Sequence, residues 1–302
     1  MMNTEKKFPQ ERIIGSESML KVAAIQTNPV FGQKIRNVTR QIELIKKAAK
    51  DGNKLIVTPE LGNTGYVFNS REELFELAEV VPDGETCQKW IQVCKEESIY
   101  LCCGITEREG NLFYNSAVLI GPDGFIGKYR KNHLWDEDKL WFEPGNLGFP
   151  VFNLPFGRVG MLICYDGWHP EVPRIYALQG VDILCDPSAW VVVPGVVTAE
   201  KPLSAYLHLA NAHFSNIFMI CSDRTGSERG ATFLGNSCIA GPNGFINGPA
   251  SLEKEEIVSA EINILDARRK HWSSFAKVLA DRRTDLYDEY LGYDISSRKS
   301  KK

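Results

Sequence analysis

The sequence predicts one layered α/β domain, because short runs of branched apolar residues alternate with longer amphipathic stretches along most of its 302 residues. Residues 21–27 (KVAAIQT) are typical of a buried strand. Residues 35–52 place apolar side chains near helical spacing and stop at Gly52, a residue type that often follows a helix. No low-complexity linker separates the two halves. We therefore expect a single domain over residues 19–290.

The same alternation runs through both halves. Ser70 is a candidate N-cap for an early helix. Turn sequences at 108–111 and 121–124 predict consecutive paired strands on either side of them. We expect helices at 35–52, 70–80, 85–98, from about 170, and at 203–216, and strands at 21–27, 54–60, 100–107, 115–121, 124–131, 159–164, 181–188, 217–223, 236–241 and 256–262.

The two ends of the chain differ from this pattern. Residues 1–18 lack the apolar stretch of a secretory signal, so we expect a flexible extension before Met19. Residues 291–302 are polar and basic, and we expect a flexible tail there. Nowhere in the sequence do about 18 apolar residues run together, as a membrane-spanning helix would need.

Composition narrows the classes of partner. The 35 basic and 38 acidic residues give a net charge of −3, which produces no field that would gather nucleic acid or an anionic membrane. The cysteines mostly lie in apolar runs, as buried free thiols do, and this suggests a reducing, cytoplasmic setting. Cys102 and Cys103 are adjacent, whereas zinc ligands usually come in spaced sets, so we expect no metal site. The eight cysteines are Cys87, Cys94, Cys102, Cys103, Cys164, Cys185, Cys221 and Cys238.

Three polar residues stand where predicted strands end: Glu60, Lys131 and Cys164. Taken singly, each has an ordinary interpretation: a solvated carboxylate, an exposed charge patch or a buried thiol. Loops at the carboxyl ends of strands line a common crevice in α/β sheets, so the three could meet there. A thiol needs a nearby base or cation to react at neutral pH, which Glu60 and Lys131 could supply. Lys131 could also stabilise an oxyanion.

From about Met19 to Tyr287 the chain resembles the nitrilase (carbon–nitrogen hydrolase) superfamily. The stretches that carry the resemblance are LIVTPELGNTGY with Glu60, YNSAVLIGPDGFIGKYRKNHLW with Lys131, FEPGN, and VGMLICYDGWHPEVPRIYALQGVDIL with Cys164. The resemblance implies a four-layer αββα sandwich whose protomers pair into homodimers or larger homo-oligomers. It also implies that Glu60, Lys131 and Cys164 are the catalytic residues and that no cofactor is required.

Two positions depart from the family pattern. A second acidic residue often lies in the loop before the PG turn, and counting back from Gly145 gives Asp138 where a Glu is usual, with Glu137 one residue away. An exposed charge cluster would also account for this stretch. Many relatives have an Arg where this chain has Trp168. Relatives that hydrolyse N-carbamoyl amino acids look as though they hold the substrate carboxylate with arginines at this place.

We therefore expect an enzyme that cleaves the carbon–nitrogen bond of a small amide to an acid and ammonia or an amine through a thioester on the cysteine. The substrate is expected to be a small amide, nitrile or ureido molecule. A nitrilase is the nearest alternative, although nitrilases tend to have Trp and Glu after the nucleophile where this chain has Tyr165 and Asp166. An N-carbamoyl (ureido) amidohydrolase is a second enzymatic possibility, and a non-enzymatic interaction protein on the same fold is a third possibility from a different functional class.

The acyl pocket is expected to favour a neutral or partly apolar group, since arginines are missing after Cys164. Arg224 or Lys201 could still supply a cation for a carboxylate. Aromatic residues near the strand-end loops could also be ordinary core or interface residues. The pocket candidates are Tyr66, Trp135, Tyr165, Trp168 and Trp190.

Overall fold

The computed structural model describes residues 18–198, 200–201 and 203–291. The expected extension at 1–18 and the expected tail at 291–302 lie outside these residues, apart from Ser18 and Leu291. The chain divides into two compact units between Arg268 and Arg269. The first unit contains all the sheets, and the second contains helix α8 (Thr284–Leu291).

The first six-stranded sheet has the order β14-β1-β2-β3-β4-β5. Its strands β1, β2 and β3 run parallel, whereas β14, β4 and β5 pair antiparallel with their neighbours. Val22 pairs with Leu55 across β1 and β2, which sets the register of the parallel part. The strands are β1 (Met19–Gln26), β2 (Leu55–Val57), β3 (Tyr100–Glu109), β4 (Leu112–Gly121), β5 (Gly124–Arg130) and β14 (Glu256–Asn263).

The second six-stranded sheet repeats this plan in the order β13-β12-β9-β8-β7-β6. Strands β7, β8 and β9 are parallel, and β6, β12 and β13 are antiparallel to their neighbours. The strands are β6 (Val151–Leu154), β7 (Gly157–Met161), β8 (Ile183–Pro187), β9 (Phe218–Ser222), β12 (Cys238–Gly241) and β13 (Gly244–Asn247). A two-stranded ribbon pairs β10 (Ser227–Glu228) with β11 (Ala231–Thr232).

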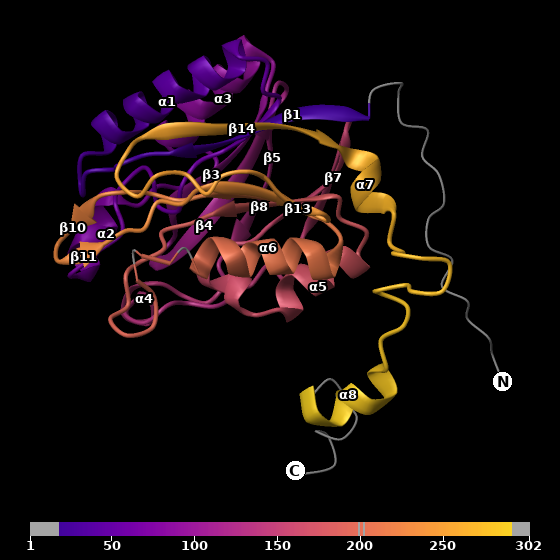
Figure 1. Ribbon diagram of the computed structural model, residues 1–302. Helices are drawn as coiled ribbons and strands as arrows, with labels where there is room; N and C mark the ends of the chain where they lie inside the picture. Colours follow the sequence, from indigo (N-terminus) through magenta and orange to yellow (C-terminus); the bar gives the residue numbers. More distant parts are fainter. Residues whose placement is uncertain (1–17, 199, 202, 292–302) are drawn as a thin grey trace. The chain divides into compact units, whose positions relative to one another are not determined.

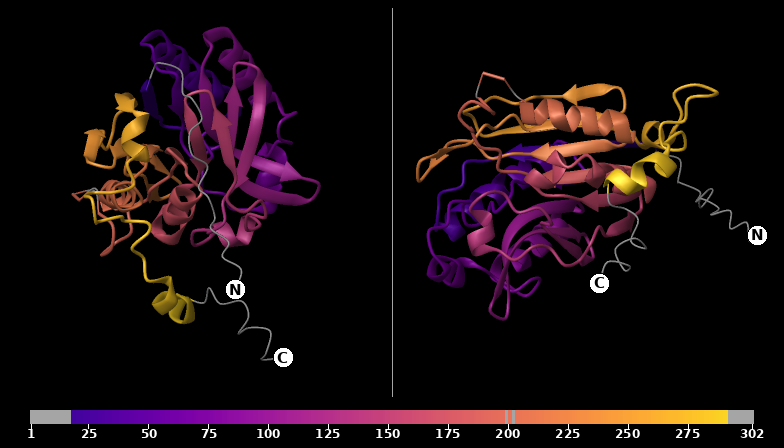
Figure 2. Two further views of the ribbon diagram at one scale, coloured as in Figure 1. Left: turned by 90° about the vertical axis from the view of Figure 1, so that its right-hand side faces the viewer. Right: turned by 90° about the horizontal axis from the view of Figure 1, so that it is seen from below.

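The two sheets face each other and helices cover their outer faces, as Figures 1 and 2 show. Helices α1 (Lys34–Lys50) and α3 (Glu85–Glu97) pack on the first sheet, and α5 (Glu171–Leu178) and α6 (Leu203–Ser215) lie on the outer side of the second. Strand β1 contacts β9, and β3 contacts β8, across the interior. This arrangement confirms the predicted αββα sandwich. The shorter helices are α2 (Arg71–Leu77), α4 (Asp138–Trp141), the 3-10 helix η1 (Cys164–Trp168) and α7 (Ile264–Arg268).

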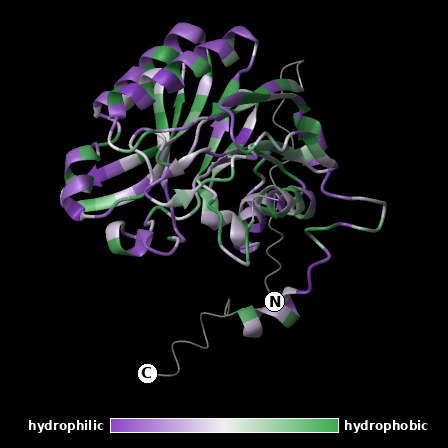
Figure 3. Ribbon diagram, turned by 60° about the vertical axis from the view of Figure 1, so that its left-hand side comes forward, coloured by the Kyte–Doolittle hydropathy of each residue, from purple (hydrophilic) through white to green (hydrophobic). Residues whose placement is uncertain are grey.

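Amphipathic helices hold the outer layers in place. Helix α1 buries Val38, Leu44 and Ile45 toward the sheet and ends with Lys47 and Lys50 in its last turn, where cations favour the helix dipole. Figure 3 shows the same division, with hydrophobic colour along interior strands and hydrophilic colour on the outward turns of the covering helices. Ser70 caps α2 as predicted, since its hydroxyl accepts a hydrogen bond from the amide of Glu73.

The strand ends that carry the polar residues differ in detail from the sequence prediction. Strand β2 ends at Val57, three residues before Glu60, and β7 ends at Met161, three residues before Cys164. Lys131 follows the last residue of β5 directly. Short connecting segments therefore place two of the three side chains beyond the end of the sheet. Within the described part of the chain, no helix combines the length and the apolar character needed to cross a membrane.

Candidate active site

Lys131 lies between two carboxylates in the interior of the first unit. Its Nζ atom donates to Oε1 of Glu60 at 2.7 Å and to Oδ2 of Asp138 at 2.9 Å. The side chains of Lys131 and Glu60 have no exposed surface. Glu137 is exposed at the start of α4, so Asp138 and not Glu137 contacts the lysine. The loop after β5 and the first turn of α4 thus bring together one cation and one acid that are seven residues apart.

Glu60 has one engaged and one free carboxylate oxygen. Besides Lys131, the side-chain amide of Asn115 donates to Oε1 at 2.6 Å. The second oxygen, Oε2, is buried and has no hydrogen-bond partner among the described residues. A buried acceptor without a partner is costly in a folded protein, so this oxygen is available to a proton donor that enters the site.

Burial sets the protonation of these groups. It raises the pKa of Glu60 to about 6, while the positive charge of Lys131 acts in the opposite direction. For Lys131, burial by itself lowers the pKa, but the charges of Asp138 and Glu60 outweigh it and hold the pKa well above its usual value. At neutral pH the lysine is therefore charged and Glu60 is ionised but close to its titration range, as a general base requires.

Cys164 begins the short helix η1 in a left-handed backbone conformation, with φ of 49°. Its amide donates to Oδ1 of Asp186 at 2.8 Å. Burial raises the pKa of the Cys164 thiol well above its usual value, and the charge of Glu60 raises it further. Lys131 and the backbone amide of Ala189 favour the thiolate. The resting thiol is thus protonated and needs a base to become a nucleophile.

Asp166 ties the Cys164 turn to the Lys131 loop. Its Oδ2 accepts hydrogen bonds from the Tyr129 hydroxyl at 2.7 Å and from the Ile163 amide at 3.1 Å. Its Oδ1 accepts from the amide of His133 at 2.9 Å. Tyr129 and His133 lie two residues on either side of Lys131, so one buried carboxylate fixes the spacing between the thiol and the lysine.

A cavity of about 240 Å³ opens above Cys164. Trp135, Tyr165, Trp168 and Trp190 line it, whereas Tyr66 is not among its lining residues. The Tyr66 ring instead lies 5.9 Å from Nζ of Lys131. The remaining lining residues are Ala189, Val191, Val193, Val196, Val197 and Ser204. The described lining contains no lysine or arginine, so the cavity suits a neutral, apolar group.

The two cations considered for a substrate carboxylate do not line this cavity. Arg224 is buried and pairs with Glu228 at 2.7 Å, and it also donates to the carbonyl of Pro29. Lys201 is exposed. Neither of these two cations is therefore placed to meet a group bound in the cavity.

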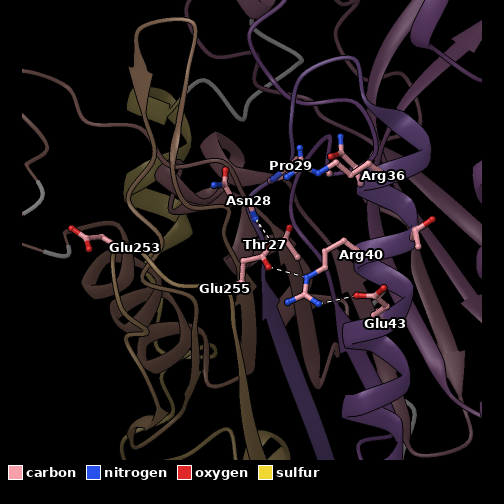
Figure 4. A pocket seen from close by; sticks show the side chains of 11 residues that line it. Thr27, Asn28, Pro29, Arg36, Arg40, Glu43, Glu253 and Glu255 are labelled. Atoms are coloured by element: carbon pink, nitrogen blue, oxygen red, sulfur yellow. Dashed lines mark hydrogen bonds and ion pairs between the residues drawn. The ribbon is translucent and has the colours of Figure 1, made fainter.

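A larger cleft of about 580 Å³ lies elsewhere in the first unit and is strongly polar. Figure 4 shows that Arg40 in this cleft points to both Glu255 and Glu43, at 2.9 and 2.8 Å. Cys164 does not line it. Because Arg40 is already paired with Glu43 and Glu255, and the thiol of Cys164 lines the smaller cavity, that cavity is the better candidate for chemistry.

Several groups at the site were not singled out from the sequence. Asn115 comes from the strand β4, and Asp186 and His208 come from β8 and α6. Asp186, His208 and Cys221 have potential ligand atoms that all lie within 4.8 Å of one another. Asp186 at the end of an apolar run carries the same strand-end signal as Glu60, but nothing in the sequence pairs it with a histidine 22 residues later.

Comparison with known proteins gives a consistent result. The carbon-nitrogen hydrolase family matches residues 21–270. A nitrilase of Pyrococcus abyssi is 42% identical over 269 residues, covering 89% of this chain and 99% of the relative. A citrullinase of Francisella tularensis is 31% identical over 292 residues, covering 90% and 98%. A carbon-nitrogen hydrolase structure from Helicobacter pylori superposes with a TM-score of 0.79 at 28% identity, covering 91% of this chain and 98% of that one. The chain therefore belongs to the carbon–nitrogen hydrolase family of the nitrilase superfamily.

Proposed function

We propose that this protein hydrolyses a small amide with a neutral, apolar acyl group, using Cys164 as the nucleophile. The observation that carries the proposal is the buried Glu60–Lys131 pair, which leaves one oxygen of Glu60 without a partner in the interior that also holds the thiol. A structural ion pair would gain from satisfying both oxygens, whereas a general base needs one of them free.

In the first half-reaction, Glu60 takes the proton of the Cys164 thiol and the sulfur adds to the amide carbonyl carbon. The carbonyl oxygen becomes an oxyanion, which the ammonium of Lys131 stabilises. Collapse of this tetrahedral species breaks the carbon–nitrogen bond. Glu60 returns the proton to the leaving nitrogen, so ammonia or an amine departs and a thioester remains on Cys164.

In the second half-reaction, Glu60 removes a proton from water, and the hydroxide oxygen adds to the thioester carbon. Lys131 stabilises the oxyanion again. The carbon–sulfur bond then breaks, the proton on Glu60 returns to the sulfur, and the carboxylic acid leaves. Asp138 keeps Lys131 charged and fixed in place through both steps, since its Oδ2 accepts a hydrogen bond from Nζ of Lys131 at 2.9 Å.

The cavity supports an apolar acyl group. The indole and isopropyl groups of Trp135, Trp190 and Val197 surround it, and its volume of about 240 Å³ accommodates a branched or aromatic group of modest size. A carboxylate on that group would be buried without a partner, which costs several kcal/mol. This argues against a carboxylate-bearing ureido substrate, although a citrullinase is among the relatives.

Nitrile hydrolysis is a second candidate, because the Pyrococcus abyssi relative at 42% identity is a nitrilase. The same thiolate would add to a nitrile carbon, and the cavity imposes the same preference for an apolar substituent. Homo-oligomerisation and a cytoplasmic location stay predictions from the sequence.

Mass spectrometry of the intact protein tests the proposal. After brief exposure to a panel of apolar amides, nitriles and ureido compounds, we expect an acyl adduct that maps to Cys164. Cys164→Ala should show neither adduct nor turnover while it keeps the thermal unfolding temperature of the wild type within a few degrees. Turnover by purified Cys164→Ala would refute the assignment of the nucleophile.

A further inference from the structure

A buried aspartate and histidine lie directly behind the Cys164 turn. Oδ1 of Asp186 accepts a hydrogen bond from the Cys164 amide at 2.8 Å and another from the Ser188 hydroxyl at 2.9 Å. Its other oxygen, Oδ2, lies 2.9 Å from Nε2 of His208. Both side chains have no exposed surface. The aspartate thus connects helix α6 with the backbone of the proposed nucleophile.

Helix α6 also contacts the turn through Gly167. The side-chain amide of Asn211 donates to the Gly167 carbonyl at 2.7 Å. A methyl group on Gly167 would lie 2.2 Å from Nε2 of His208, so only glycine allows the imidazole to come this close. Helix α6 therefore contacts the backbone of the turn at Gly167 through both Asn211 and His208.

The Cys164 turn needs such support because of its backbone. A non-glycine residue at φ of 49° is strained, and it keeps that conformation only where the surroundings impose it. The hydrogen bond from the Cys164 amide to Asp186 is the contact that fixes this residue directly. Loss of the bond would let the turn relax and would move Sγ away from Glu60 and Lys131.

We propose that His208 and Asp186 act together as positioning residues, which hold the Cys164 amide and thereby aim its thiol. This inference rests on the proposed role of Cys164. His208 does not line the cavity above Cys164, although its ring lies 5.0 Å from that of Trp190, which does. The proposed effect on kcat reaches the reaction through the backbone of the nucleophile, whereas a displaced Trp190 would change KM.

A hydrogen bond at Nδ1 fixes the ring of His208 against Asp186. Nδ1 lies 2.7 Å from the carbonyl of Ser204, which can only accept, so Nδ1 carries a hydrogen. Nε2 of His208 and Oδ2 of Asp186 are in close polar contact at 2.9 Å without the geometry of a hydrogen bond, and neither atom has another hydrogen-bond partner among the described residues. A metal ion between these atoms is disfavoured, because two ligands on tetrahedral zinc lie about 3.3 Å apart at usual bond lengths.

Two substitutions at His208 separate its two contacts. In His208→Asn the shorter amide reproduces the Nδ1 position and keeps the bond to Ser204, but it cannot reach Asp186. In His208→Gln the amide nitrogen reproduces the Nε2 position and keeps a polar contact with Asp186. His213→Asn is the matched control, since His213 lies on the same helix and contacts the carbonyl of Pro242, away from the turn.

The measurement is the rate at which iodoacetamide alkylates Cys164, read by peptide mass spectrometry, together with kcat and KM on a substrate from the adduct screen. We expect His208→Asn to lower both the alkylation rate and kcat by about 10–100-fold with KM changed less than about threefold. His208→Gln and His213→Asn should stay within about threefold of wild type. The thermal unfolding temperature of each variant shows whether a lower rate reflects loss of folded protein.

Equal behaviour of the Asn and Gln variants at position 208 would overturn the inference while Cys164 still reacts in the wild type. An unreactive wild-type Cys164, with turnover retained in Cys164→Ala, would instead refute the proposed function. One zinc ion per chain by elemental analysis, lost in His208→Gln, would also overturn the inference in favour of a metal site that includes Cys221.

Discussion

The Nζ atom of Lys131 lies 2.7 Å from Oε1 of Glu60, and neither side chain is exposed to solvent. A buried ion pair contributes little to stability by itself, because removing both charges from water costs about as much as their attraction returns. Removing one partner, however, leaves the other charge buried without compensation and destabilises the fold. Substitutions at the pair should therefore lower both the reaction rate and the stability, so each kinetic measurement is paired with the unfolding temperature of the same variant.

Lys131→Gln should lower kcat by about 100–1,000-fold, because the variant loses the cation that faces the developing oxyanion. Lys128→Gln is the matched control, since Lys128 lies three residues earlier, on β5, and pairs with Glu107. Steady-state kinetics on both variants check this, with circular dichroism to confirm folding. Equal, small effects at the two positions would assign Lys131 to a structural charge cluster.

Asp138→Asn should lower kcat by about 10–100-fold, whereas Glu137→Gln should leave it unchanged. Asp138 contacts Lys131 and supports its charge, but Glu137 is exposed. Each variant removes one negative charge, and the two positions are adjacent, so kinetics at fixed ionic strength compare them directly. If the Glu137 variant lost more activity than the Asp138 variant, the loop would have to rearrange when substrate binds.

The pH profile of kcat/KM should fall on the acid side near pH 6. Burial raises the pKa of Glu60 to about 6, and the carboxylate accepts the thiol proton only when it is ionised. Below this pKa the rate should drop about tenfold per pH unit, and above it the rate should level off. The profile is measured from pH 4.5 to 8 in buffers of constant ionic strength. An acid limb below pH 5 would exclude Glu60 as the titrating base.

A neutral apolar amide should be preferred over the same amide carrying a terminal carboxylate by at least about 30-fold in kcat/KM, since burying an unpaired carboxylate costs about 2 kcal/mol or more. An N-carbamoyl amino acid should be a poor substrate for the same reason. Trp168→Arg places a cation in the cavity lining and should narrow this preference. A wild-type preference for the N-carbamoyl amino acid would show that a cation outside the described lining holds the carboxylate.

The sequence alone predicted the layered fold and singled out three polar positions at or just beyond the strand ends. Each strand and helix has its own apolar pattern, because each must bury one face whatever its neighbours are. Glu60, Lys131 and Cys164 were recognisable since each follows such a run. The short edge strands β6 and β13 and the ribbon of β10 and β11 were not predicted, because two to four residues carry too little periodicity.

Only the tertiary structure decided which side chains meet. The sequence left both Asp138 and Glu137 open, and the turn into α4 buries one and exposes the other. The contact between Asp186 and His208 joins β8 to α6, and α6 also packs against η1, although these segments are tens of residues apart in the sequence. Local patterns indicate which face of a strand or helix is apolar, whereas the partners of a residue across layers are set by how the layers pack.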